Sequence, residues 1–255
     1  MVKVMEYALR QLCEKITEKW ISEHIEDSTF HEATGFDDGV RKQLVKQLEK
    51  TSDSYKKNFI DVLNEIEVVN RDLEQYYMHG LKIINIDLKA VMGLCVHYEN
   101  PLHVFFHEMG HAIDYNRGGY ERLSLGDSFK KAFSKDIHLL IERLNDEDEV
   151  FEMRRIRSDD ESRGIQDIFS SLPYLNEKGE FEGEFNNVDV YNLRPRYMHQ
   201  PDYWRRLNDP AIDARSELFA HISAAQASKK QQEYMREYFP NSFKTFTELM
   251  EKSRV

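Results

Sequence analysis

Two histidines and a glutamate stand close together near the middle of the chain, in the order His107-Glu108-Met109-Gly110-His111. In an α-helix, residues four apart lie on one face, so both histidines can aim an imidazole nitrogen at one metal ion. Glu108 projects beside them, where its carboxylate can take a proton from a zinc-bound water that attacks a carbonyl and deliver it to the leaving amine. The pattern predicts a Zn²⁺ site that hydrolyses peptide bonds, with Glu108 as the base.

The alternative is an accidental H-E-x-x-H match on an amphipathic helix. Apolar neighbours disfavour it, because Phe105, Phe106 and Ile113 would bury this helix, and two buried histidines without a metal would be costly. Only two cysteines occur, Cys13 and Cys95, each among apolar residues and without a C-x-x-C pair. We therefore expect buried free thiols, and a metal must be bound by histidines and carboxylates.

A catalytic zinc site of this kind needs a third protein ligand. The metzincin extension would require Gly at position 114 and His at position 117, but the chain has Asp114 and Arg117, so that subclass is excluded. An acidic residue on a later helix is the next candidate, and Glu217 lies among the apolar residues Leu218 and Phe219. On spacing alone, a solvated or salt-bridged helix face is the better interpretation of Glu217.

A resemblance to a known family changes that balance. The motif H-E-x-x-H-A-x-D at 107–114, followed by E-x-F-A at 217–220, resembles the anthrax lethal factor catalytic-domain family, which includes the clostridial Pro-Pro endopeptidases. In that family the glutamate that opens E-x-F-A is the third zinc ligand, which implies the same role for Glu217.

A closer resemblance is to the peptidase-like domains of phage and prophage head-morphogenesis (minor head) proteins. It covers roughly residues 81–255 and leaves the N-terminal helices outside. The matching stretches are Gln-Asp-Ile-Phe at 166–169, His-Gln-Pro-Asp-Tyr-Trp at 199–204, Glu-Leu-Phe-Ala-His at 217–221 and Tyr-Phe-Pro at 238–240. The resemblance implies a zincin-like metallopeptidase domain, with phage structural proteins as candidate partners.

One position departs from the lethal factor pattern. There a tyrosine lies seven residues before the ligand glutamate and is thought to stabilise the oxyanion, whereas this chain has Pro210. The role can pass to Tyr203 or to His199, since both belong to the segment that must approach the metal, and either can donate a hydrogen bond to a tetrahedral oxyanion. A structural role is equally compatible with each residue.

Two further side chains are expected near the metal without binding it. Asp114 lies one turn beyond His111, where its carboxylate can orient a ligand imidazole, although a helix cap or a salt bridge is the alternative. His221 shares a helix face with Glu217. It is either a polar neighbour of the metal or a histidine satisfied within the core.

The elements that must position these residues follow from the apolar spacing. The pattern predicts a three-helix N-terminal segment with a turn at 35–39, then short strands, then the histidine helix ended by Gly118 and Gly119. Further helices are expected towards the C-terminus, with a loop or hairpin at 176–187. The expected ranges are 9–20, 44–48 and 59–66 for the first three helices, 81–86 and 90–98 for the strands, and 129–144, 213–227 and 230–252 for later helices, the last interrupted near Pro240.

These elements predict an α+β fold that is mostly helical. We expect an N-terminal helical segment over residues 1–80 and a zincin-like domain over 81–255, with a small sheet before the histidine helix. Hydrophobic residues make up 40% and charged residues 32% of the chain, which is typical of a globular protein with a real core.

Charge and hydropathy bear on partners and location. The formal net charge of −11 repels phosphate backbones, so we expect no nucleic-acid partner. The acidic excess either keeps the chain soluble or favours a basic substrate. No uninterrupted apolar stretch near the N-terminus suits a signal peptide or a membrane span, so we expect a cytoplasmic protein, phage-associated if the resemblance holds, and no membrane partner.

The leading functional hypothesis is a zinc-dependent endopeptidase that acts on a protein or peptide. One alternative is a phage-derived structural or binding module that retains the zinc-binding scaffold without significant proteolysis. Glu108 favours the enzyme, because a purely structural metal has no use for a base, whereas Pro210 favours the module. A third hypothesis, a toxin-like effector acting on a host protein, shares the chemistry of the enzyme.

Overall fold

The computed structural model describes residues 37–70, 75–118, 121–180 and 210–252, together with 21, 23, 25, 199, 203 and 204. Within these residues the protein is mostly helical and has one three-stranded sheet. The expected α+β, mostly helical class is therefore confirmed. None of the described helices combines the length and the apolar character needed to cross a bilayer.

The helices and strands are given in chain order, with four short 3-10 turns between them. The regular elements are α3 (Asp38–Glu49), α4 (Asp53–Leu63), β1 (Glu67–Val69), β2 (Tyr76–Met78), β3 (Ile83–Asn85), α5 (Leu88–Leu94), α6 (His103–Arg117), α7 (Asp127–Leu144), α8 (Glu147–Arg155), α9 (Arg163–Phe169), α11 (Pro210–Ala225), α12 (Lys229–Tyr238) and α13 (Pro240–Lys252). The 3-10 turns are η2 (Leu123–Leu125), η3 (Ile156–Ser158), η4 (Asp160–Ser162) and η5 (Leu172–Tyr174).

The sheet has the strand order β1-β3-β2, with β1 parallel and β2 antiparallel to the buried central strand β3. Val68 of β1 and Tyr77 of β2 both lie opposite Ile84. The strand predicted at 81–86 is confirmed by β3. The N-terminal helical segment was predicted to extend too far along the chain, because α4 ends at Leu63 and the two outer strands of the sheet follow it.

The strand predicted at 90–98 is wrong, because α5 occupies this stretch. The side chain of Asp87 accepts a hydrogen bond from the backbone N–H of Ala90 and caps the helix. Leu88 and Val91, three residues apart, are the buried side chains of α5, whereas Leu94 is 75% exposed. The apolar run thus buries only one helix face.

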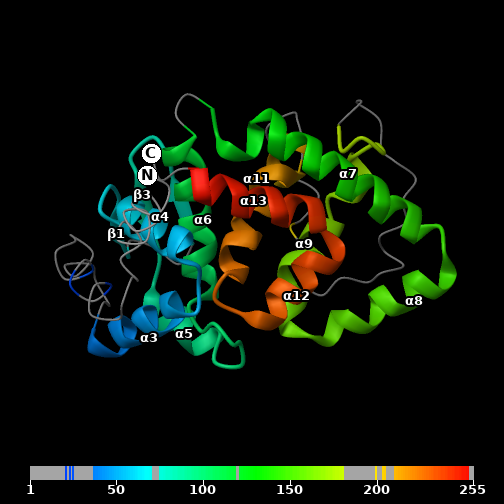
Figure 1. The fold of residues 1–255 in the computed structure, drawn as a ribbon. Helices are drawn as coiled ribbons and strands as arrows, with labels where there is room; N and C mark the ends of the chain where they lie inside the picture. The colour runs from blue at the N-terminus through cyan, green and yellow to red at the C-terminus, as the bar shows by residue number, and fades with distance from the viewer. Residues whose placement is uncertain are drawn as a thin grey trace, which may run out of the picture.

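Helices α6 and α11 pack against each other at the centre of the molecule (Figure 1). They approach closely at Gly110, where an added Cβ would lie 2.7 Å from the Cα of Ala220, so the crossing requires glycine. Nearby, Ser223 of α11 donates to the carbonyl of Phe106, 3.1 Å away, and its hydroxyl lies 2.7 Å from that of Tyr55 in α4. This packing fixes the histidine helix against the helix that carries Glu217.

The N-terminal elements share the same core. Phe59 of α4 packs against Phe106 with ring centroids 4.9 Å apart, and Asn58 donates to the carbonyl of Met250 in α13 at 3.0 Å. β2 and β3, on the two sides of the predicted boundary at residue 80, are adjacent strands. The two-part division stays a prediction, as does the helix at 9–20, which lies with Cys13 outside the described residues. Cys95 is a buried free thiol, as expected.

The C-terminal helices agree with the apolar periodicity. α7 matches the helix expected at 129–144, α11 that at 213–227, and the last helical stretch divides into α12 and α13 at Pro240. Asn176 makes a turn by accepting from the backbone N–H groups of Lys178 and Glu180, both at 2.9 Å. The rest of the loop predicted at 176–187, beyond residue 180, lies outside the described residues.

Candidate metal centre

His107 and His111 lie on one face of α6, as their spacing predicts. Their rings are nearly perpendicular, with centroids 4.9 Å apart. The helix runs from His103 to Arg117 and ends at Gly118, the expected terminator.

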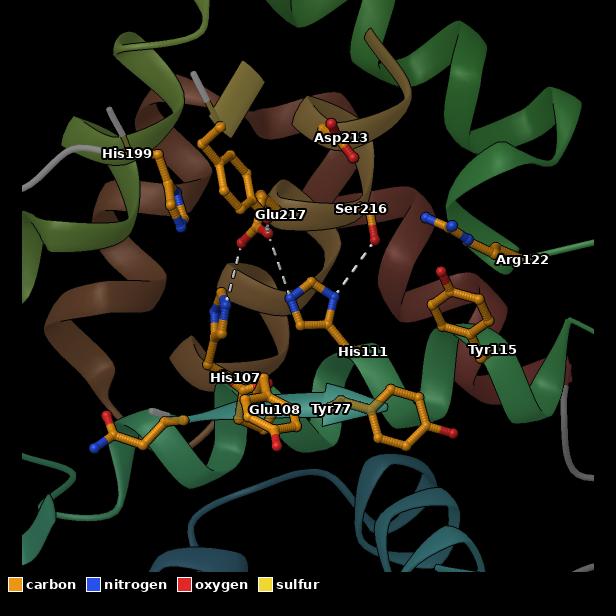
Figure 2. A pocket seen from close by; sticks show the side chains of 13 residues that line it. Tyr77, His107, Glu108, His111, Tyr115, Arg122, His199, Asp213, Ser216 and Glu217 are labelled. Atoms are coloured by element: carbon orange, nitrogen blue, oxygen red, sulfur yellow. Dashed lines mark hydrogen bonds and ion pairs between the residues drawn. The ribbon is translucent and has the colours of Figure 1, made fainter. Parts of the chain in front are cut away.

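Glu217 of α11 faces both histidines (Figure 2). Its Oε2 lies 3.2 Å from the Nε2 of His107, and its Oε1 lies 3.6 Å from the Nε2 of His111. In a tetrahedral site with bonds of 2.0–2.1 Å, neighbouring ligand atoms are about 3.4 Å apart. The buried Oε2 accepts no hydrogen bond of good geometry from the described residues. The three side chains therefore have the donor types that zinc binds, and the carboxylate of Glu217 lies at ligand spacing from each imidazole.

The charges of this triad are coupled. Burial lowers the pKa of His107 to about 3. Burial also acts to lower the pKa of His111, but the Glu217 carboxylate outweighs it and raises this pKa to about 9. Burial acts to raise the pKa of Glu217, yet His111 and His107 bring it well below its usual range. The carboxylate thus stays ionised beside the imidazoles, which is the form that binds a metal.

Glu108 lines the same cavity and is 7% exposed. Burial raises the pKa of its carboxyl to about 7, against the lowering effects of His111 and of a hydrogen bond from the Tyr77 backbone. A carboxylate with a pKa near neutrality can both accept and return a proton. Its position beside the triad fits the predicted base.

Asp167 of α9 connects two histidines near the triad. Its carboxylate accepts from the backbone N–H of His199 at 2.8 Å, and it lies 2.9 Å from both the Nδ1 of His199 and the Nε2 of His221. Burial acts to raise the pKa of Asp167, but the two histidines lower it to about 2. The ring of His221 lies 4.4 Å from that of His107. Asp167 therefore holds two histidines beside the candidate metal centre.

Sequence reasoning did not single out Asp167 as a functional residue. A signal was present, because Asp167 stands among the apolar residues Ile165, Ile168 and Phe169, and an acidic side chain on such a face needs a buried partner. The sequence could not identify that partner, since His199 is 32 residues away.

Both candidates for oxyanion stabilisation line the cavity. The hydroxyl of Tyr203 donates to Oε1 of Glu217, and the ring of Tyr203 stacks on His199 with centroids 3.7 Å apart. Trp204 anchors this short segment, because its Nε1 donates to the Oγ of buried Ser170 at 3.0 Å. Tyr203 and His199 are thus held next to the triad, as the sequence predicted.

Asp114 reaches the centre less directly than expected. Its carboxylate accepts from the backbone N–H of Ser124 at 2.7 Å and from the hydroxyl of Ser124 at 2.6 Å. The Oγ of Ser216 lies 3.4 Å from Asp114 and 3.4 Å from the Nδ1 of His111. Among the described residues, the hydrogen-bond route from this carboxylate to a triad imidazole is therefore a long one through Ser216, although the charge of Asp114 also acts to raise the pKa of His111.

Two other combinations of described side chains share His107 or Glu217 with the triad. The donor atoms of His107, Glu217 and His221 all lie within 4.8 Å of one another, as do those of Asp167, His199 and Glu217, and His111 belongs to neither group. Contacts with Asp167 occupy one ring nitrogen of His199 and one of His221. We therefore take His107, His111 and Glu217 as the ligand set that fits best.

The triad opens into a cavity of about 330 Å³. Its wall combines β2 with residues of α6, α11 and the segment that follows α6. A scan against protein-family models and searches of curated proteins and of solved structures find no match. The functional conclusion therefore depends on the chemistry of the site.

Proposed function

We propose that the protein is a zinc-dependent endopeptidase. The observation that carries the proposal is that the two carboxylate oxygens of Glu217 lie 3.2 Å from His107 Nε2 and 3.6 Å from His111 Nε2, with Glu108 in the same cavity. A metal site needs only the triad, whereas hydrolysis also needs a base. The resemblance to the lethal factor family supports the same assignment and a zincin-like fold.

Each side chain has a role in this proposal. Bound zinc would polarise the scissile carbonyl and promote ionisation of the attacking water. Glu108 accepts the proton of that water and transfers it to the leaving amine nitrogen. Tyr203 donates a hydrogen bond to the developing oxyanion, with His199 as the second candidate. Asp167 orients His199 by accepting from its Nδ1, which leaves Nε2 as the nitrogen that does not contact Asp167.

The sheet supports a peptide substrate. β2 is the outer strand of the sheet formed by the described residues, in the order β1-β3-β2, and its residues Tyr76 and Tyr77 line the cavity. An extended peptide can pair with such an edge strand through main-chain hydrogen bonds, independently of its side chains. We therefore propose a protein or peptide as the substrate.

The decisive experiment uses Glu108→Gln with a mixture of synthetic peptides and mass-spectrometric detection of cleavage. The amide keeps the shape of the side chain but cannot accept the proton, so hydrolysis should fall by about 10²-fold or more while zinc content stays unchanged. A chelator should abolish cleavage by the wild-type protein.

Two outcomes would reject the proposal. If Glu108→Gln cleaves the peptides at the wild-type rate, Glu108 is not the base. If the zinc-loaded wild-type protein cleaves none of them, the alternative of a zinc-binding structural module, including one that assembles with phage structural proteins, becomes the better hypothesis.

A further inference from the structure

Arg122 lies in the wall of the cavity, between the end of α6 and η2. Its guanidinium stacks on the ring of Tyr115, with the Cζ atom 4.2 Å from the ring centroid. Figure 2 shows Arg122 and Tyr115 on one side of His111, and His199 on the opposite side of the site. A substrate that spans the triad would therefore have one end near Arg122.

Arg122 makes no direct ion pair among the described residues. The nearest acid is the buried Asp114, whose pKa the charge of Arg122 acts to lower, but the oxygens of this carboxylate accept from Ser124. Arg117, five residues earlier, differs, because its guanidinium pairs with Glu65 at 3.1 Å and with Asp61 at 3.8 Å, away from the cavity. Of these two arginines, Arg122 is the one that presents its charge to a ligand.

The rest of the described cavity wall combines imidazoles with carboxyl groups. Glu108, Asp213 and Glu217 supply carboxyl groups, and Arg122 is the only Lys or Arg among the described lining residues. Outside the metal centre, Arg122 is therefore the group of the described wall that attracts a ligand anion. This local field is independent of the formal net charge of −11, which describes the whole chain.

We propose that Arg122 and Tyr115 form a subsite for a carboxylate of the substrate. The guanidinium presents paired N–H donors that match the two oxygens of a carboxylate, and stacking on Tyr115 fixes its plane before the ligand arrives. The aromatic ring adds an apolar surface for the carbon atoms next to the carboxylate. The inference rests on the proposed peptidase function and specifies its substrate class, a peptide with an acidic group on the Arg122 side of the scissile bond.

The subsite can be tested without turnover. The probes are hydroxamates that end in a carboxylate and matched hydroxamates that end in a neutral amide, each with two to five methylenes, titrated calorimetrically into the zinc-loaded full chain. At the best chain length the carboxylate should bind at least about tenfold more tightly than the amide.

Arg122→Gln should remove this preference and leave the affinity for the amide series unchanged. The matched control is Arg236→Gln, because Arg236 also lies over an aromatic ring, 4.6 Å from Phe243, but is outside the cavity. Equal binding of both series to the wild-type protein, or a preference that survives Arg122→Gln, overturns the inference. Failure of every hydroxamate to bind zinc-loaded protein rejects the metal-centre chemistry of the proposed function and the inference with it.

Cleavage then distinguishes the two sources of a carboxylate. One peptide pair compares an internal Glu with Gln, and a second pair compares a free C-terminus with a C-terminal amide. An internal preference identifies an acidic side chain, whereas a C-terminal preference identifies a carboxypeptidase-like specificity. Arg122→Glu should shift the preference towards Lys or Arg at the same position. If the protein cleaves both members of each peptide pair at the same rate, the subsite does not act on peptides and the inference is wrong.

Discussion

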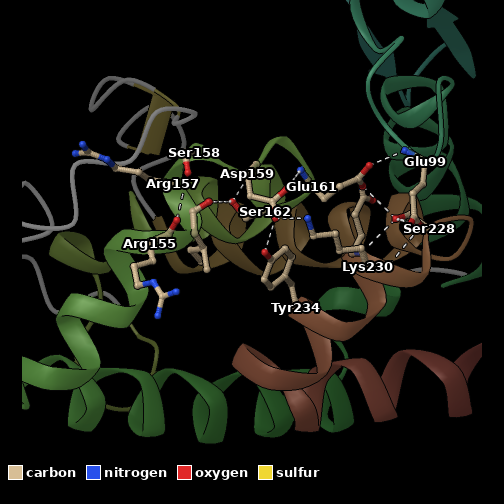
Figure 3. Close-up of polar contacts among 12 residues, drawn as sticks. Glu99, Arg155, Arg157, Ser158, Asp159, Glu161, Ser162, Ser228, Lys230 and Tyr234 are labelled. Carbon is tan, nitrogen blue, oxygen red and sulfur yellow. Dashed lines mark hydrogen bonds and ion pairs between the residues drawn. The ribbon is translucent and has the colours of Figure 1, made fainter.

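Two polar clusters, each built around a buried glutamate, differ in how their hydrogen bonds are completed. The first, which we call the Glu161 cluster, joins η4 to α12 and to the chain before α6 (Figure 3). Oε1 of Glu161 accepts from the backbone N–H of Glu99 at 2.6 Å, and the hydroxyl of Ser228 lies 3.1 Å from Oε2 of Glu161 and 2.9 Å from Oε2 of Glu99. Further contacts link Asp159 with Lys230 and Tyr234.

In the metal centre, the hydrogen bonding is incomplete. In the described part of the chain, the Oε2 of Glu217 and the Nδ1 atoms of His107 and His221 are buried and make no hydrogen bond of good geometry. Buried polar atoms in folded proteins are nearly always satisfied. The comparison teaches that the protein hydrogen-bonds both carboxylate oxygens of Glu161, whereas Oε2 of Glu217 faces an imidazole and would be completed by a metal ion.

Metal content gives the largest expected difference between the two clusters. The wild-type protein should contain near one zinc per chain, measured by atomic emission on purified protein. His107→Ala, His111→Ala and Glu217→Ala should each lose it, because each removes one of three protein ligands. Ser228→Ala in the Glu161 cluster should retain it. Unchanged zinc in both histidine variants would end the zincin hypothesis.

Tyr203→Phe sharpens the comparison within the metal centre. Zinc content and substrate affinity should stay near wild type, while the chemical step slows by about 10²–10³-fold, because the lost hydrogen bond is made mainly in the transition state. Single-turnover kinetics separate this step from binding. Wild-type turnover in Tyr203→Phe would transfer the role to His199, and His199→Gln should then show the same loss with zinc retained.

Ser228→Ala tests the Glu161 cluster through stability. Ser228 also caps α12, since its hydroxyl accepts from the backbone N–H of Gln231 at 3.2 Å. Loss of the cap and of the donor to Glu99 and Glu161 should lower the free energy of unfolding by about 2–4 kcal/mol. Urea denaturation measures this change. A drop below about 0.5 kcal/mol would show that the cluster contributes little to the fold.

The smallest expected effect concerns Asp159 and acid. Burial acts to raise the pKa of Asp159, but hydrogen bonds from Lys230 and Tyr234 outweigh it and lower the pKa below its usual value of 3.8. A lowered folded-state pKa stabilises the protein above the unfolded-state value, and this contribution disappears as the pH falls through the folded-state pKa. Asp159→Asn should therefore destabilise by about 1 kcal/mol or less at pH 7, and the difference should shrink as the pH falls through the folded-state pKa. A difference that does not shrink in acid would contradict an electrostatic origin.

Much of the helical structure could be predicted because its signals are local. The four-residue spacing of His107 and His111 identifies one helix face. Gly118 and Pro240 mark helix boundaries at the expected places. Prediction was wrong where two local signals competed. The apolar run after residue 90 fits a strand pattern. However, the Asp87 cap and the three-residue spacing of the buried Leu88 and Val91 favour a helix.

The sequence by itself determined the chemistry that is local, namely two imidazoles and a carboxylate on consecutive turns of one helix. Glu217 needed a family resemblance, because its approach to His107 depends on the close packing of α6 and α11 at Gly110. Only the tertiary structure decided the contacts of Asp167 with His199 and His221 and the position of Arg122 in the cavity wall. The physical reason is that side-chain periodicity fixes neighbours within a helix, whereas contacts between distant segments depend on how whole elements pack.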